Sequence, residues 1–569
     1  MAINFFFSTR LLKHCAFILL LFLTLNHLLV LFAYLIHSTF ISFAFPLALL
    51  FSILIHLLIS SRFGLQKRES LQASAISLLI ILLSIAISTF FYDFSWDGQW
   101  YHQAAIYHLE GDWNPILEPI KTFDKNNDLS IIHFPKGSWY YAASTLRKFG
   151  NLEAGKSINW IVLMATIFFI HSVLKGIGFS GKHAAFLPLV VVLNPVVWSE
   201  ITTYLVDGLV FLYLAIYATA MVSWIRNGDV LSFLTGLMAA VLLINVKFTG
   251  LVFFGVFAFY ISIYIIIKKK SSLWKFFLSH LITITIAVLL FGFNPYVTNV
   301  VQRGHPFYPI AGTKAYPSIL KLTGRDDNEL YETPQNMVGK SYFTRFVFAT
   351  FGMPGNAPYN DEKGAELIWP FTSKASDWKA YHYHETRVSG FGPFFSGIFL
   401  ISLVLIITIF LRDKKMRWLL LLTALSITTC LFISKHFWWP RFAPQTWLII
   451  LLPVICLLYQ PNSLKIKRFV EGLAILIAIN GLIVLIIHMG WEVRSSISLR
   501  KELSDIRLNH KMIEIDYGWF KKSMEEKLKT NGIKYKAIDG KEIKKSDYKT
   551  ITSVVDGYPN VVIYRDKSN

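Results

Sequence analysis

Long apolar runs recur along most of the chain, and they restrict its fold more than any other feature. Each run holds about 18–25 residues, enough for a helix to cross a bilayer. Hydrophobic residues make up 54% of the 569 residues and charged residues 16%, which excludes a soluble globular protein. We therefore expect an all-α polytopic membrane protein of about 13 transmembrane helices. The expected spans are residues 11–36, 41–60, 71–91, 157–175, 184–199, 201–223, 231–246, 249–267, 273–292, 391–411, 417–434, 442–459 and 468–489.

The distribution of positive charge predicts how these helices are oriented. The net charge is +20, and Lys and Arg gather in the short links between alternate spans, where acidic residues are few. This is the positive-inside pattern of membrane proteins, so the charge does not indicate nucleic-acid binding. It predicts a cytoplasmic N-terminus in a bacterial cytoplasmic (inner) membrane. The first run lacks a small-residue cleavage site, which favours a membrane helix over a signal peptide.

That orientation puts the segments with unusual composition on the outer side. Two long loops at 92–156 and 293–390, a short turn near 435–441 and the tail at 490–569 would all lie outside. Residues 1–489 then form a transmembrane domain. The tail is polar, with a helix expected at 497–529 and strands near 533–538 and 559–565, and it predicts a small extracytoplasmic α/β domain.

Two acids follow the third apolar run, in a segment crowded with aromatic and amide residues. Asp93 and Asp97 lie within residues 92–103, beside Trp96, Trp100 and Tyr101. They are either solvated acids in an aromatic belt at the membrane interface or catalytic carboxylates in a groove between loop and membrane. Their spacing is D-x3-D rather than D-x-D, which does not favour a metal site.

Further ionisable residues lie within the first loop and at the expected outer ends of the helices. Lys136, between a proline and a glycine, is interpreted either as a phosphate anchor or as solvated surface. Glu200, Tyr204 and Asp207 lie at one outer turn and Lys247 lies at another. Ionisable groups at such depth are costly. Asp207 and Lys247 therefore form either a structural ion pair or part of a site for a charged substrate.

The second loop and the short turn contribute the remaining candidates. Polar residues begin the loop, end it and fill the turn: Arg303 and His305, Glu385 and Arg387, and Lys435 and Arg441. The His-x-His-Glu run at 382–385 would also suit a metal, although no partner ligand stands at a diagnostic spacing. The three cysteines lie in apolar runs and are expected in the core. The G-x-G-x-x-G at 176–181 follows no strand and predicts no dinucleotide site.

The arrangement resembles the GT-C superfamily of integral-membrane glycosyltransferases. That superfamily includes protein O-mannosyltransferases, lipid A aminoarabinose transferases and oligosaccharyltransferase catalytic subunits. The resemblance covers residues 70–460 and rests on topology and on three short motifs, Ser95-Trp-Asp-Gly-Gln-Trp-Tyr101, Gly304-His-Pro-Phe-Tyr-Pro309 and Trp438-Trp-Pro-Arg-Phe442. The chain departs from the family pattern in two ways. Its first loop has no Asp-Asp or Asp-Glu pair, and two extra helices precede that loop.

The resemblance implies an inverting transfer of a sugar from a polyprenyl-phosphate donor to a glycan or lipid acceptor at the outer face. It implies Asp97 as the catalytic base, with Asp93 as the second candidate. Cations would stabilise the departing phosphate. The residues expected to bind substrate are Lys136, Glu200, Tyr204, Asp207, Lys247, Arg303, His305, Glu385, Arg387 and Arg441. A divalent metal stays an open alternative, and membrane lipid is an expected partner.

Two other functions remain as alternatives. A glycan polymerase or ligase that uses lipid-linked glycan would share the membrane setting and differ in substrate size. A transporter or flippase of lipid-linked sugar belongs to a different class, in which ionisable residues usually lie near the bilayer midplane and inverted repeats are common. Here the ionisable residues gather at the outer ends of the helices, and we find no convincing repeat.

Overall fold

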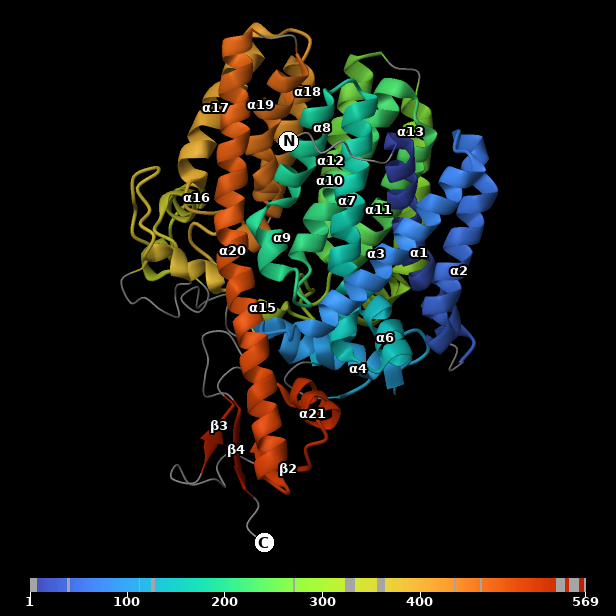
Figure 1. Cartoon of the computed structure of the whole chain (residues 1–569), viewed down its shortest axis with the longest axis vertical. Helices are drawn as coiled ribbons and strands as arrows, with labels where there is room; N and C mark the ends of the chain where they lie inside the picture. The colour runs from blue at the N-terminus through green and yellow to red at the C-terminus, as the bar shows by residue number, and fades with distance from the viewer. Residues whose placement is uncertain are drawn as a thin grey trace.

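The computed structural model describes residues 8–37, 41–111, 113–123, 128–269, 272–322, 333–355, 364–433, 436–460, 463–538, 548–551 and 562–566. Helices stand side by side in a bundle, and a small sheet lies beyond one end of it (Figure 1). Every segment expected to span the membrane contains a helix. These are α1 (Thr9–Leu35), α2 (Ile41–Ile59), α3 (Lys67–Phe90), α7 (Ser157–Gly176), α8 (Gly181–Val192), α10 (Asp207–Asn227), α11 (Val230–Val246), α12 (Phe248–Ile267), α13 (Leu273–Thr285), α17 (Phe395–Arg412), α18 (Arg417–Leu431), α19 (Trp447–Tyr459) and α20 (Leu464–Asn509).

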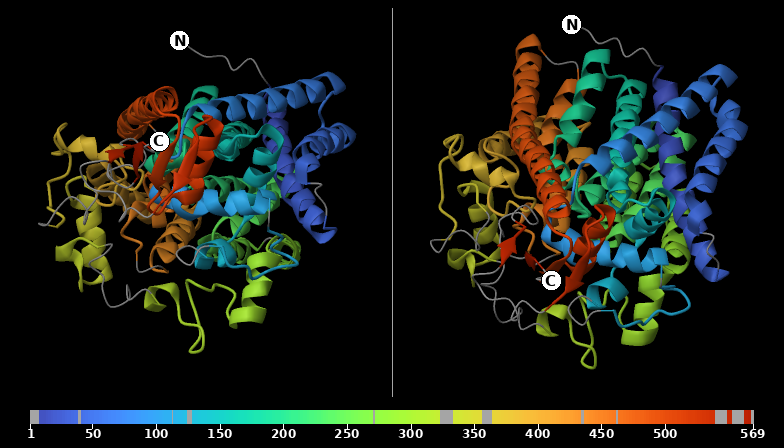
Figure 2. Two further views of the ribbon diagram at one scale, coloured as in Figure 1. Left: turned by 90° about the horizontal axis from the view of Figure 1, so that it is seen from below. Right: turned by 60° about the horizontal axis from the view of Figure 1, so that its bottom comes forward.

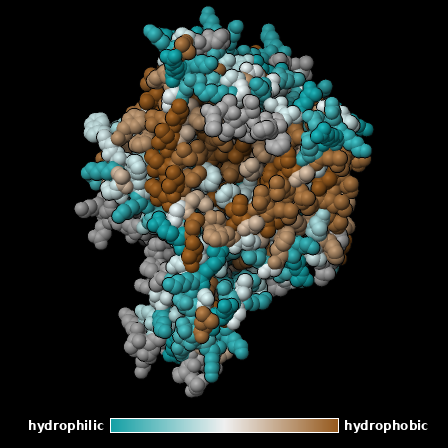
Figure 3. Space-filling view, viewed as in Figure 1, coloured by the Kyte–Doolittle hydropathy of each residue, from teal (hydrophilic) through white to brown (hydrophobic). Residues whose placement is uncertain are grey.

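The surface of the bundle is suited to lipid rather than water. Within the described residues, nine helices are long and apolar enough to cross a membrane, and four shorter apolar helices stand at the other expected spans. Hydrophobic residues cover the flank of the bundle between hydrophilic ends (Figure 3). Large apolar side chains are exposed, among them Leu58 (77%), Trp274 (68%) and Ile486 (65%). So large an exposed apolar surface requires lipid around it. The predicted multi-pass helical membrane protein is confirmed.

The fifth expected span, 184–199, is broken by a proline. α9 (Pro195–Glu200) begins after Asn194, whose side-chain oxygen accepts a hydrogen bond from the Val196 N–H at 3.1 Å. Pro195 suits the first turn of a helix, where its missing N–H would have no partner. Residues 201–206 form a buried turn, so the next helix begins at Asp207 and not at 201 as predicted. Glu200 and Asp207 therefore flank one turn at the end of the bundle.

The two long loops and the tail lie at the same end of the bundle (Figures 1 and 2). The first loop holds α4 (Gln103–Gly111), α5 (Asp128–His133) and α6 (Gly137–Phe149), and the second holds α14 (Thr298–Arg303), α15 (Ile319–Leu322) and α16 (Tyr342–Phe351). In both views of Figure 2, the red helix of the tail, α21 (Lys521–Thr530), lies beside the light-blue helix α4 of the first loop. The predicted topology requires both long loops and the tail to lie on one side of the membrane, and their common position agrees with it. Which side of the membrane they face stays a prediction.

The tail is built on a helix that begins in the membrane part. α20 runs for 46 residues, about 69 Å at 1.5 Å per residue, through the expected domain boundary at 490. The helix predicted at 497–529 is interrupted by β1 (Ile513–Asp516), where Ile alternates with acids and one face is buried. Between β1 and the later strands lies α21 (Lys521–Thr530).

The strands form a small mixed sheet, as predicted for the tail. Its order is β2-β1-β4-β3, with β2 (Tyr535–Ala537), β3 (Lys549–Thr550) and β4 (Ile563–Asp566). β1 pairs with β2 in parallel and with β4 in antiparallel orientation, and β3 pairs antiparallel with β4.

The tail shares one hydrophobic core with the first loop. Phe94 is 1% exposed and belongs to the same cluster as Leu499 of α20, Phe520 and Leu528. Trp96 meets the Phe520 ring edge-to-face, with the ring centroids 5.0 Å apart. The acidic segment at 92–103 is therefore held by the tail as well as by α3.

Replacing Phe520 by alanine should loosen the tail from the first loop, since loss of a buried aromatic side chain costs about 3–5 kcal/mol. We expect the tail of Phe520→Ala to be cut by limited proteolysis under conditions that leave the wild-type tail intact. Leu508 of α20 is 72% exposed, so Leu508→Ala is the control and should resist like wild type. Equal resistance of the two variants would contradict the dependence on this core.

Candidate functional site

One buried arginine joins three parts of the chain that lie far apart in sequence. Arg441 stands in the short 3-10 helix Pro440–Phe442 and is 8% exposed. Its Nη2 lies 3.0 Å from Asp97 Oδ2, and its Nε lies 3.1 Å from Asp207 Oδ2. Its Nη1 contacts Glu385 Oε1. A single guanidinium therefore pairs with carboxylates from the first loop, from α10 and from the second loop.

Lys247 brings a second cation to the same acids. It stands between α11 and α12, where its extended backbone (φ −154°, ψ 148°) separates the two helices. Its ammonium group pairs with Asp207 Oδ1 and lies 4.8 Å from the centroid of the Phe442 ring. Asp207 thus accepts one cation on each oxygen. We call this group the arginine cluster, consisting of Asp97, Asp207, Lys247, Glu385 and Arg441.

Glu200 lies at the edge of the arginine cluster and caps α10. Its Oε2 accepts a hydrogen bond of 2.7 Å from the N–H of Gly208, in the first turn, where backbone donors lack helical partners. Burial, followed by the negative charge of Asp207, raises the pKa of Glu200 to about 8. Glu200 is then mostly neutral at pH 7, and the cluster holds three carboxylates against two cations. The positive end of α10 favours the excess negative charge.

Asp97 is the carboxylate of the arginine cluster most open to an entering group. Its side chain is 25% exposed, against 19% for Glu385 and 3% for Asp207. Burial raises the pKa of Glu385, although the nearby charge of Arg441 opposes the shift. A partly exposed carboxylate held by a cation is able to exchange partners, whereas Asp207 is enclosed between its two cations.

Arg387 and a cavity lie next to the cluster. The Arg387 guanidinium stacks 4.1 Å from the centroid of the Trp439 ring. Residues of α9, of the second loop and of the turn at 439–441 line the cavity, including Ser199, Tyr383, His384, Glu385, Trp439 and Arg441. The cavity therefore lies between two members of the arginine cluster, Glu385 and Arg441, and the aromatic rings of Tyr383 and Trp439.

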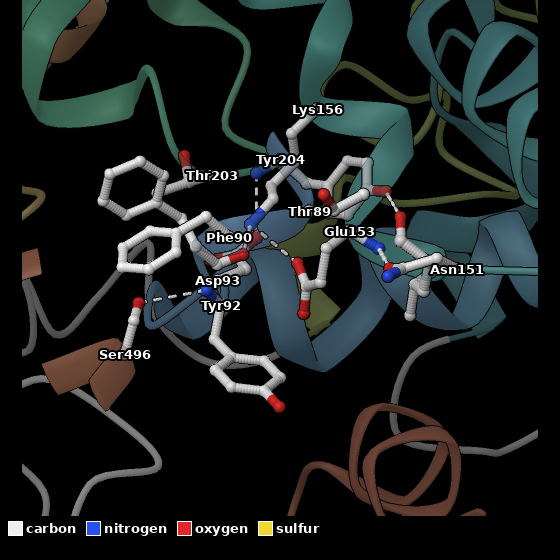
Figure 4. Close-up of polar contacts among 12 residues, drawn as sticks. Thr89, Phe90, Tyr92, Asp93, Asn151, Glu153, Lys156, Thr203, Tyr204 and Ser496 are labelled. Carbon is white, nitrogen blue, oxygen red and sulfur yellow. Dashed lines mark hydrogen bonds and ion pairs between the residues drawn. The ribbon is translucent and has the colours of Figure 1, made fainter. Parts of the chain in front are cut away.

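Asp93, the second catalytic candidate, is fully buried, and its carboxylate points toward the backbone of Tyr204 (Figure 4). Its Oδ1 accepts hydrogen bonds from the backbone N–H (2.8 Å) and the hydroxyl (2.6 Å) of Ser95. Its Oδ2 accepts the N–H of Tyr204 at 2.8 Å. Burial raises the pKa of Asp93, while the nearby charge of Lys156 opposes the shift. Both oxygens are therefore engaged in fixing the segment that carries Asp97.

Tyr204 and Lys136 also stand apart from the arginine cluster. The Tyr204 hydroxyl donates to the carbonyl of Leu152. Lys136 is 1% exposed and donates to the carbonyls of Ile132 (2.8 Å) and Phe134 (2.9 Å). Burial lowers the pKa of Lys136 well below its usual range. Lys136 is thus neither solvated surface nor open to a phosphate in this structure, and its contacts satisfy the end of α5.

The residues that begin the second loop make local contacts. Arg303 lies 5.6 Å from the centroid of the Tyr308 ring and 4.8 Å from that of Tyr316. His305 Nδ1 accepts the N–H of Phe307 at 3.1 Å. These contacts shape the loop without reaching Arg441. Lys435, expected as another cation of the short turn, lies outside the described residues.

Sequence reasoning missed the partners of the His-x-His-Glu run. His384 lies against His488 and Glu492 of α20, and in the described part of the chain this is the one group of three His, Cys, Asp or Glu side chains placed to hold a metal. The i, i+4 spacing of His488 and Glu492 was the available signal, but the expected boundary at 490 separated them.

No protein-family model, curated protein or solved structure matches the chain.

Adding a methyl group at Gly98 should disturb the segment that carries Asp97, because a Cβ there would lie 2.1 Å from Asp93 Oδ2 and 2.3 Å from Ser95 Oγ. We expect Gly98→Ala to lose about 1–3 kcal/mol of stability, the usual cost of overpacking, and to displace Asp97. The unfolding midpoint in detergent, followed by differential scanning fluorimetry, measures the effect. Gly111→Ala, where a Cβ meets no atom within 4 Å, is the control. An unchanged midpoint in Gly98→Ala would refute this account.

Proposed function

We propose that the chain is a membrane glycosyltransferase of the GT-C type, which transfers a sugar from a polyprenyl-phosphate-linked donor to a hydroxyl acceptor with inversion. The observation that supports it best is the convergence of Asp97, Lys247 and Arg441 at the end of a bundle with an apolar flank. A base and two cations suit a reaction in which an acceptor loses a proton while negative charge accumulates on a lipid-linked phosphate.

In the proposed step, the acceptor oxygen forms a bond to the anomeric carbon of the donor sugar. The bond from that carbon to the phosphate oxygen breaks, and its electron pair leaves with the polyprenyl phosphate. Asp97 takes the hydroxyl proton, and Arg441 and Lys247 stabilise the phosphate. Asp97 is paired with Arg441 at 3.0 Å, so the donor phosphate would first replace it on the guanidinium. That exchange frees the carboxylate to act as a base.

Purified protein incubated with a panel of polyprenyl-phosphate sugars and with hydroxyl acceptors tests the proposal. Release of polyprenyl phosphate, together with a single added sugar on the acceptor, is the expected result. A product extended by a whole glycan would favour a polymerase or ligase. Movement of the donor across proteoliposomes without release of polyprenyl phosphate would favour a transporter.

Asp97→Asn should remain folded and should lower the transfer rate by at least about 100-fold, the usual scale for loss of a general base. Released polyprenyl phosphate measures the rate, and an unchanged unfolding midpoint shows that the protein is intact. Glu118→Gln is the control, because Glu118 is a 62% exposed acid of the same loop. Near-normal turnover by folded Asp97→Asn protein would exclude Asp97 as the base.

Lys247 is expected to bind the donor phosphate in addition to balancing Asp207. Loss of one charge-assisted contact should weaken donor binding by about 1.5–3 kcal/mol in Lys247→Met. The double variant Lys247→Met, Asp207→Asn removes one cation and one acid and so restores the net charge of the wild-type cluster. Stability should therefore recover while donor affinity stays low. Isothermal titration with donor lipid measures both, and Lys121→Met, a change at a surface lysine of the first loop, is the control. Wild-type donor affinity in the double variant would exclude the phosphate role.

A further inference from the structure

A second polar group lies between the second loop and α20, separate from the arginine cluster. His384, His488 and Glu492 are 4%, 0% and 0% exposed. Their ligand atoms all lie within 4.8 Å of one another. Nε2 of His384 is 2.6 Å from Glu492 Oε1, and Nε2 of His488 is 3.7 Å from the same oxygen. We call these three residues the histidine cluster.

The hydrogen bond made by Nδ1 of His488 determines the protonation state of the other ring nitrogen, Nε2, which faces the cluster. Nδ1 lies 3.0 Å from the backbone carbonyl of His382. A carbonyl only accepts, so Nδ1 carries the proton, and in a neutral imidazole Nε2 then carries the lone pair. Histidines that bind metals are typically oriented by such a hydrogen bond from the opposite nitrogen.

Glu492 supplies a separate observation. Its Oε2 is buried and makes no hydrogen bond within the described part of the chain. A buried carboxylate oxygen without a partner is costly, and a bound cation would remove that cost. His488 and Glu492 are four residues apart on α20, so both project from the same face of the helix toward His384.

We propose that His384, His488 and Glu492 bind a zinc ion. Two imidazoles and one carboxylate match the ligands of zinc, whereas magnesium and calcium prefer oxygen ligands alone. Tetrahedral zinc at its usual bond lengths places ligand atoms about 3.3 Å apart. His384 Nε2 and Glu492 Oε1, now 2.6 Å apart, would separate slightly to admit the ion, and His488 Nε2 would approach that oxygen from 3.7 Å. A water molecule would complete the coordination.

The zinc would link the second loop to α20 and thereby fix the backbone next to the arginine cluster. His384 directly precedes Glu385, which contacts Arg441. The ion is a positioning element in this account, and the proposal does not depend on the reaction that the arginine cluster performs.

Zinc content of the full-length protein, purified in detergent without a histidine tag, tests the proposal. Protein stripped with a chelator, re-equilibrated with zinc chloride and desalted should retain about one zinc per chain by inductively coupled plasma mass spectrometry. Glu492→Gln and His488→Gln should each weaken binding by at least about tenfold. His382→Gln is the control, since the carbonyl of residue 382 remains. Magnesium chloride at the same concentration should not displace the zinc.

A measurement on wild-type protein keeps the test independent of variant folding. Cobalt(II) added to stripped protein should give the visible absorption bands of a four-coordinate ion, and zinc should abolish them. Absence of these bands together with no retained zinc would overturn the proposal and leave the histidine cluster as a hydrogen-bonded group. Zinc retained equally by folded wild-type and Glu492→Gln protein would also overturn it, because the ion would then lie elsewhere.

Discussion

The pairing of Arg441 with three carboxylates is the interaction on which the site depends. A buried guanidinium loses its hydration and is stable only where acids replace the water. The acids come from the first loop, from α10 and from the second loop, so Arg441 is satisfied only when all three segments are assembled. Asp207 is a buried carboxylate and needs cations in place of water, and Arg441 and Lys247 supply them. The charges at this end of the bundle therefore behave as one electrostatic unit.

A separate frame holds that unit in place. Asp93 ties the acidic segment to the turn at Tyr204, and Phe94 anchors it in the core of the tail. Asp97 follows four residues after Asp93, on the short stretch of backbone that these two neighbours restrain. The segment thus contains two acids with different surroundings. One is enclosed by hydrogen-bond donors, and the other stays partly exposed beside a cation.

The helices were predictable because an apolar run is a local property of the sequence. The break before Pro195 was not predicted, and proline alone does not locate it, because Pro46, Pro188 and Pro453 lie inside helices α2, α8 and α19. Asp207 and Lys247 drew attention because charge is unusual in apolar helices. Lys136 was selected for its place between a proline and a glycine, but in the structure it satisfies nearby carbonyls. Which charges meet is decided by packing between distant segments. Glu492 was missed because it stands in a polar stretch, where an acid is ordinary.

The continuity of α20 couples the membrane part to the tail. His488 and Glu492 face the second loop, and Leu499 is buried in the core that the tail shares with the first loop. Each residue added to an α-helix turns everything beyond it by about 100° and moves it by about 1.5 Å. One inserted residue between Glu492 and Leu499 would carry the apolar face of the tail away from Phe94. This stretch of helix therefore sets both the distance and the rotational angle between two halves of the protein, and no insertion or deletion within it would leave both unchanged.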